Sequence, residues 1–276
     1  MKKNLFIIVF IGFAFTSFCQ KAANKKIQAG IITGFGLNFT NPTTKYISRN
    51  GVGTDFSIGM NINYNYTSNI GFSSGVEFDF ETIKLKTDSS LYYVYNDTEI
   101  LTKSQYSNTT NIFSLTEGKV YKLNSRNEKP IYLTIPTMLL FRTDYIGFIR
   151  YFGKFGLRNS ILLSNTINDS GFSYDNDLLP IPVKNENMKT SHRDLSLFKS
   201  FIGISGGTEW NFIGTTSLVF ELGFYYGFLN ISRGTALIGD DDKNLSIITN
   251  HNTSALIYNS LPAKQNQLLL KVSILF

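Results

Sequence analysis

Strict alternation of bulky apolar and small polar residues is the feature that most constrains this chain. It is clearest in residues 55–66, where apolar and aromatic side chains alternate with Asp, Ser, Gly and Asn. A period of two residues is typical of a β-strand whose two faces meet different surroundings. It excludes an amphipathic helix, whose apolar residues would recur every three or four positions.

The alternation recurs often enough to predict an all-β fold with eight antiparallel strands. Each predicted strand has one bulky apolar face and one face of Gly, Ser, Asn and charged residues. The small polar faces suit a crowded interior and the bulky faces suit lipid, so we expect an eight-stranded transmembrane β-barrel with long extracellular loops. The expected strands cover residues 27–39, 56–66, 70–82, 131–142, 147–164, 197–212, 217–229 and 265–276.

The lengths of the predicted connections alternate in a regular way. Residues 67–69, 143–145 and 213–216 form short connections, whereas the others are long. Transmembrane barrels have short periplasmic turns and long outer loops. The sequence therefore predicts an outer-membrane location with both termini in the periplasm. The long connections cover residues 40–54, 83–130, 165–196 and 230–264.

The N-terminus has the pattern of an export signal. A Met-Lys-Lys start precedes an apolar run, and the small residues Ser17 and Cys19 fit the positions that a signal peptidase requires. We expect a signal peptide over residues 1–19 and an outer-membrane barrel domain over residues 20–276. In the rival interpretation Cys19 is the lipidated first residue of a lipoprotein, although Phe18 is large for the position before it.

Composition separates this chain from two other classes of protein. Charged residues make up 17% and aromatic residues 14% of the chain. A helical membrane protein would be far more apolar, and a soluble enzyme usually has about 25% charged residues. The net charge is +6, but Lys and Arg are interleaved with acidic residues, so we expect no nucleic-acid partner.

Two details of the predicted barrel concern single residues. Pro136 lies inside a predicted strand and has no N–H to donate, so we expect a bulge or a missing ladder bond there. Tyr64, Tyr66, Trp210 and Tyr226 lie near predicted strand ends. Their amphipathic rings fit the headgroup level of a membrane.

Short motifs resemble a known family. Residues 131–140 contain the Tyr-Leu-x-Ile-Pro-x-x-Leu pattern common in PorT-type outer-membrane β-barrel proteins of the Bacteroidota, and residues 221–231 resemble another strand of that family, with Phe228 in place of a Leu. The terminal Phe276 resembles the signal that the barrel-assembly machinery recognises. The resemblance implies a barrel fold and that machinery as a partner during biogenesis. Some relatives serve the gliding-associated secretion system.

Several charged residues are predicted to face the barrel interior. Acidic and basic residues occur on neighbouring strands, and an unpaired charge in a narrow interior is costly, so we expect cross-strand ion pairs. We interpret them as a structural polar network; a gated ion path is the alternative. The predicted network contains Glu77, Asp79, Lys154, Arg158, Lys199, Glu209, Glu221 and Lys271, with Glu81 beside them.

Candidate chemistry is confined to the predicted loops. His192 and His251 are the only histidines, and residues 191–194 contain Ser, His and Asp, but residues adjacent in sequence rarely form a triad. Residues 240–242 are three aspartates that lack the spacing of a Ca²⁺ loop. We therefore expect no catalytic residues, no metal and no cofactor.

The predicted function is that of a non-enzymatic outer-membrane protein whose barrel anchors extracellular loops for binding or an envelope function. Its expected partners are outer-membrane lipid, the barrel-assembly machinery and other envelope proteins. The alternatives are an accessory subunit of a secretion or envelope-assembly complex, a small channel, and a rim-located enzyme that modifies lipid or peptide.

Overall fold

The computed structural model describes eight stretches of the chain, and all of their regular structure is β. The prediction of an all-β fold is confirmed. Among these residues, no helix is long and apolar enough to span a bilayer. The described stretches are residues 25–101, 118–174, 179–190, 195–214, 216–232, 248–250, 257–258 and 261–276.

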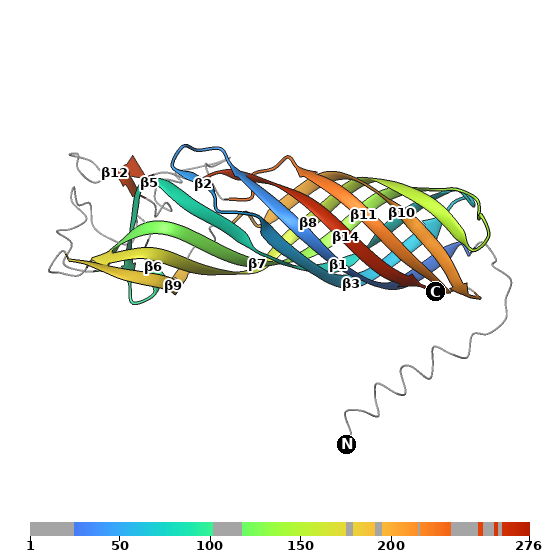
Figure 1. Cartoon of the computed structure of the whole chain (residues 1–276), viewed down its shortest axis with the longest axis horizontal. Helices are drawn as coiled ribbons and strands as arrows, with labels where there is room; N and C mark the ends of the chain where they lie inside the picture. Colours follow the sequence, from blue (N-terminus) through green and yellow to red (C-terminus); the bar gives the residue numbers. More distant parts are fainter. Residues whose placement is uncertain are drawn as a thin grey trace, which may run out of the picture.

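Eight strands pair in a closed circuit, which we call the ring. Each pairs antiparallel with the next, and the last strand, β14, pairs with β1 along most of its length. Figure 1 shows the ring on the right, with its strands inclined to the long axis. The ring strands are β1 (Ile27–Pro42), β3 (Gly53–Asn65), β4 (Ile70–Glu81), β7 (Lys119–Arg142), β8 (Ile149–Tyr174), β10 (Phe198–Ile213), β11 (Thr216–Gly227) and β14 (Ala263–Leu275).

Alternation in the sequence becomes alternation in exposure along the ring strands. On β3, Asp55 and Ser57 are buried inside the ring, whereas Phe56 and Ile58 are exposed on its outside. Successive side chains of a strand point to opposite faces, so on this stretch of β3 the polar side chains lie inside and the apolar side chains lie outside.

The described residues form fourteen strands, which are the eight of the ring and six more. The extra strands lie in the segments that we predicted as long loops. β7 begins at Lys119 rather than near residue 131, and β8 continues to Tyr174 rather than ending near residue 164. The extra strands are β2 (Ile47–Arg49), β5 (Ile83–Asn96), β6 (Glu99–Ile100), β9 (Pro180–Thr190), β12 (Ile248–Asn250) and β13 (Ile257–Tyr258).

These additional strands build a second unit on one end of the ring, which we call the extension. It comprises β5, β6, β9, residues 119–130 of β7 and residues 165–174 of β8, and it occupies the left of Figure 1. β5 pairs with β7, β7 with β8, and β8 with β9, all antiparallel. The short β6 pairs with both β9 and β5, so the extension is also a circuit, closed by two parallel residue pairs.

The inward face of β7 changes parity inside the extension. Arg126 and Glu128 are buried on the same face as Thr134, whereas Tyr121 and Leu123 are buried with the opposite parity. A register shift against β8 between Leu123 and Ser125 separates the two stretches. A β-bulge of this kind inserts one residue into one strand, which moves all later side chains to the other face.

The two ends of the ring differ in their connections. Short connections join β3 to β4, β7 to β8 and β10 to β11 at the end that we call the turn end. The described chain also begins and ends there, and the N–H of Phe276 donates to the carbonyl of Ala29. The extension lies at the opposite end (Figure 1).

Pro136 interrupts the ladder between β4 and β7 without a bulge. The paired residues jump from Ser74 opposite Thr137 to Glu77 opposite Thr134, and the register is the same on both sides. The hydroxyl of Ser74 donates to the carbonyl of Pro136 at 2.8 Å. Missing ladder pairs, one of the two outcomes we expected, therefore accommodate this proline.

Candidate functional site

The outside of the ring is apolar on all eight strands. Exposed large apolar side chains occur along each strand. The outward face of the extension combines polar side chains with a buried apolar cluster of Tyr92, Val94, Val120 and Ile248 on β5, β7 and β12. Among the described residues beyond the ring strands, Leu179 and Ile181 are exposed apolar positions beside β8. Representative exposed residues of the ring are Ile31, Phe35, Ile58, Met60, Val76, Phe78, Ile135, Leu139, Phe155, Leu157, Ile202, Ile204, Phe220, Leu222, Leu270 and Ile274.

The interior of the ring carries charges of both signs in equal number among the described residues. Burying a charge without a partner is costly, so such a set has to be paired internally. The six cationic side chains are Arg142, Arg150, Lys154, Arg158, Lys199 and Lys271, and the six carboxylates are Asp55, Glu77, Asp79, Glu81, Glu209 and Glu221.

Arg158 is the centre of this network and is completely buried. Its guanidinium donates to Glu77 at 3.0 Å and to Asp79 at 2.7 Å, both on β4. Lys271 donates to both oxygens of Glu77 at 2.8 Å. Thr134 also donates to Asp79. The three strands β4, β8 and β14 are thus connected through the interior.

A second ion pair lies closer to the extension. The ammonium of Lys199 is 2.6 Å from Glu81 and lies 3.6 Å from the centre of the Tyr132 ring. Gln265 and Gln267 donate to Glu81 as well, at 3.2 and 2.8 Å. The Glu81 carboxylate is therefore surrounded by donors.

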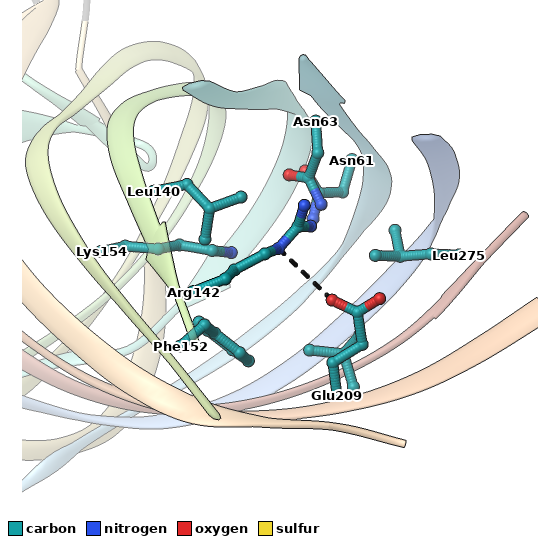
Figure 2. A pocket seen from close by; sticks show the side chains of 9 residues that line it. Asn61, Asn63, Leu140, Arg142, Phe152, Lys154, Glu209 and Leu275 are labelled. Carbon is teal, nitrogen blue, oxygen red and sulfur yellow. Dashed lines mark ion pairs between the residues drawn. The ribbon is translucent and has the colours of Figure 1, made fainter. Parts of the chain in front are cut away.

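The turn end of the interior contains a third group of charges. Arg150 holds Glu209 through two hydrogen bonds of 2.9 and 2.7 Å. Figure 2 shows Arg142 extending toward the same carboxylate, with Asn61 and Asn63 beside its guanidinium. The distance from Arg142 Nε to Glu209 Oε2 is 3.4 Å. The cavity among these side chains has a volume of about 10 Å³, which is roughly room for one water molecule.

All eight network residues that we predicted lie buried inside the ring and take part in ion pairs. Among the described ion pairs, that of Arg150 and Glu209 joins two neighbouring strands, β8 and β10, and Glu221 also faces Lys271 on the neighbouring strands β11 and β14. The other pairs cross the interior; Lys154 reaches Glu221 on β11 at 2.6 Å, past β10. Alternation gives the face of a side chain but not its partner across a closed ring.

Sequence reasoning missed three charged residues of the interior. Arg142 has the parity of the inward Thr134 on β7, and Arg150 has that of Lys154 and Arg158 on β8, so the alternation already indicated both. Asp55 was assigned to the polar face of its strand but not to the network. One of its oxygens accepts from Gln267 at 3.2 Å, and the other has no hydrogen-bond partner.

The interior also contains large apolar side chains, which differs from the small and hydrophilic interior that we predicted. Met138, Phe201, Tyr225 and Leu269 form one cluster between the ionic groups. The ring of Tyr225 lies against Gly203, where an added Cβ would be 2.2 Å from a ring carbon. Glycines at such positions leave room for bulky neighbours in a narrow ring. A second cluster contains Leu140, Phe152, Val219 and Leu275.

The extension has the opposite organisation, with an apolar core. Tyr93 and Tyr121 stack with ring centres 5.0 Å apart, and Leu91 and Leu123 are buried beside them. The same cluster continues to Tyr132, above the Lys199–Glu81 pair. Apolar side chains therefore cover the extension end of the charged interior.

One buried ion pair lies inside the extension core. Arg126 donates to both oxygens of Asp169 at 2.9 and 2.8 Å, and the hydroxyl of Tyr93 donates to the same carboxylate at 2.8 Å. Burial raises the pKa of Tyr93, and the negative charge of Asp169 raises it further. Burial also raises the pKa of Tyr121. Both phenols are therefore held in the neutral form.

The predicted aromatic positions lie near the two rims of the ring. Tyr66 and Trp210 are exposed at the turn end, where the rings of Tyr64 and Tyr66 contact each other edge to face at 5.0 Å. Tyr226 is exposed near the end of β11 toward the extension. Phe276, the predicted assembly signal, is half-exposed at the turn end.

The other sequence candidates lie outside the described residues. These are the predicted signal peptide over residues 1–19, His192 and His251, and the acidic residues 240–242.

Known proteins resemble this chain in structure rather than in sequence. No family model and no curated protein matches it. Solved structures similar to it are outer-membrane β-barrel proteins. OprG from Pseudomonas aeruginosa has 11% identity and a TM-score of 0.40, with 93% of this chain and 98% of that chain covered. Neisserial surface protein A has 9% identity and a TM-score of 0.33, with 93% and 100% covered.

A third structure is Ail of Yersinia pestis in complex with the heparin analogue sucrose octasulfate. It has 8% identity and a TM-score of 0.33, with 91% of this chain and 100% of that chain covered. These TM-scores are too low to establish the fold of this chain. The closed ring is established by its own strand pairing.

Proposed function

We propose that this chain is a non-enzymatic outer-membrane protein whose eight-stranded ring spans the bilayer and anchors the extension for binding outside the cell. The observation that carries the proposal is the inverted polarity of the ring, which has large apolar side chains outside and paired charges inside. In water this arrangement would expose apolar surface on all eight strands at once. In lipid the same surface is solvated by hydrocarbon.

The height of the apolar belt agrees with a membrane span. On β4 the exposed apolar residues run from Ile70 to Phe80. At about 3.3 Å per residue and a tilt of about 40°, this stretch covers roughly 25 Å along the barrel axis, which is the usual height of the apolar band in such barrels. The closed circuit leaves no free strand edge within that height, as a bilayer requires.

The filled interior favours an anchor over a channel. The ion pairs of Arg158 and Lys199 cross it at two levels, the Arg150–Glu209 pair fills its turn end, and apolar clusters lie between these groups. An ion path would need a continuous opening, and the cavity beside Arg142 holds about one water molecule. Membership of the PorT-type family and a role beside a secretion complex stay predictions.

The direct test is whether the purified mature chain, residues 20–276, needs an amphiphile. We expect it to refold in detergent or phospholipid vesicles, to migrate faster on a gel before boiling than after, and to float with the vesicles in a density gradient. A preparation that stays folded and monodisperse in plain buffer would overturn the proposal.

Orientation is tested with single cysteines in a chain that lacks a cysteine once residues 1–19 are removed. Asn168→Cys lies on the extension and Ser68→Cys lies in the turn between β3 and β4. With both termini in the periplasm, a membrane-impermeant maleimide should label Asn168→Cys on intact cells and Ser68→Cys only after lysis. The reverse result would contradict the proposed orientation.

A further inference from the structure

The apolar belt ends sharply where β7 leaves the ring. Leu133 and Ile131 face outward at the end of the belt, and the next residue on that face is Lys129. The outward residues that follow on β7 are Asn127 and Ser125, since Arg126 and Glu128 are buried. The surface therefore changes from hydrocarbon-like to cationic and polar within one strand repeat.

β5 adds two lysines to the same face. Ile83 and Leu85 are buried in the extension core, so Lys84 and Lys86 point outward. Lys84 pairs with Asn127, the neighbour of Lys129 on that face, and such diagonal positions on adjacent strands are about 7–8 Å apart. Lys84, Lys86 and Lys129 thus form one cluster directly beyond the belt.

The cluster has no compensating negative charge among the described side chains. None of the three lysines forms an ion pair with a described residue, and the adjacent outward residues of β8 are Thr166, Asn168 and Ser170. A cationic cluster at this height of a membrane protein lies at the level of the lipid headgroups.

We propose that Lys84, Lys86 and Lys129 form a binding site for the phosphate groups of anionic lipids in the outer leaflet. The inference rests on the proposed membrane span, because only a bilayer around the belt places phosphates at this position. The apolar side chains of Ile131 and Leu133 would contact the acyl chains of the same lipid, while the lysines and Asn127 contact its headgroup.

The test is a lipid titration followed by native mass spectrometry. Wild type in a neutral detergent is titrated with lipid A, with dephosphorylated lipid A and with inorganic phosphate. We expect lipid A to bind at least tenfold more tightly than the other two, and the difference to shrink when the ionic strength rises. Dephosphorylated lipid A that binds as tightly as lipid A would overturn the proposal. Inorganic phosphate that binds as tightly as lipid A would also overturn it, because the site would then bind a free anion and not a lipid.

The matched variants separate this site from the general charge of the chain. K84Q/K86Q/K129Q should bind lipid A at least tenfold more weakly than wild type. K119Q/K122Q/K184Q removes three lysines farther along the extension and should bind like wild type. Equal losses in both variants would contradict a local site. Vesicle flotation of each variant is measured first: a wild type that does not float refutes the proposed function, whereas one that floats but does not discriminate among the probes refutes this inference alone.

Discussion

The ring and the extension are built from the same two long strands, yet they are organised in opposite ways. In the ring, β7 and β8 place charged residues such as Arg158 inside and apolar residues such as Phe155 outside. In the extension the same strands contribute Leu123 to an apolar core and Asn168 to the outside. β7 and β8 stay paired from one region to the other, with register shifts at Leu123/Ser125 and at Ile131/Tyr132, and the chemistry of their two faces changes.

This contrast teaches that pairing geometry and polarity are separate properties of a β-structure. A strand can pass from one environment to the other without ending, provided that the chemistry of its two faces changes at the boundary. The extra residue Asn124 shifts the inward face of β7, and the extra residue Leu163, opposite Ile131 and Tyr132, shifts the inward face of β8. The comparison leads to four predictions.

The largest effect is expected from removing the central cation of the ring. Arg158→Ala leaves Asp79 and part of the Glu77 charge without a partner inside the ring, and breaking such a buried pair costs about 3–5 kcal/mol. The free energy of unfolding in vesicles, measured by urea titration, should fall by this amount. Arg126→Ala is the matched change in the extension; it should increase protease cleavage there and leave the unfolding of the ring nearly unchanged.

If Arg158→Ala unfolds at the same urea concentration as wild type, the interior network does not stabilise the ring. If both variants unfold the ring equally, the two regions are one cooperative unit and the comparison fails.

The second largest effect is expected from adding a charge to the outward face of β8, in the ring and in the extension. Phe155→Arg places a cation in the middle of the apolar belt, which costs about 2–4 kcal/mol in a bilayer. Asn168→Arg makes the same addition on the outward face of the extension and should cost less than about 0.5 kcal/mol. Refolding yield and urea unfolding in vesicles measure both. Equal effects of the two substitutions would place the two faces in the same solvent.

A smaller effect is expected from filling the space beside Tyr225. Gly203→Ala puts a methyl group 2.2 Å from a carbon of the Tyr225 ring, so the ring must shift, at a cost of about 1–3 kcal/mol. Gly206→Ala on the same strand meets no atom closer than 3.5 Å and is the control. The double variant Gly203→Ala with Tyr225→Leu should recover part of the loss. A Gly203→Ala variant as stable as the control would show that the interior is loosely packed.

The smallest effect concerns pH in the extension. The pKa of Tyr93 is raised by burial and by Asp169, so the folded extension keeps the proton at a pH where the unfolded chain loses it. The resulting stabilisation is complete below the ordinary tyrosine pKa of about 10 and is lost as pH rises through the higher folded pKa. Protease resistance of the extension should therefore decline above about pH 10, while the ring stays folded. Tyr93→Phe should remove the part of this loss of protease resistance that comes from the Tyr93 phenol. If the pH profile of Tyr93→Phe equals that of wild type, other groups cause the loss.

Sequence reasoning located the ring strands because their alternation is long and uniform. The predicted starts at Ile27 and Ile70 are those of β1 and β4, and the predicted end of the fourth strand at Arg142 is that of β7. It missed the extension because those strands have shorter apolar runs interrupted by polar residues. Their partners are also distant in the chain; Ile83, for example, pairs with Glu128.

The sequence alone determined which side chains of each ring strand share a face, because that depends only on the period of two residues. It therefore identified the inward charges Glu77, Arg158 and Lys271 without knowledge of the fold. Only the tertiary structure decided which of them meet, because closing the ring brings β4, β8 and β14 together across the interior. Partner choice depends on curvature and depth within the ring, and neither quantity is encoded in the alternation of a single strand.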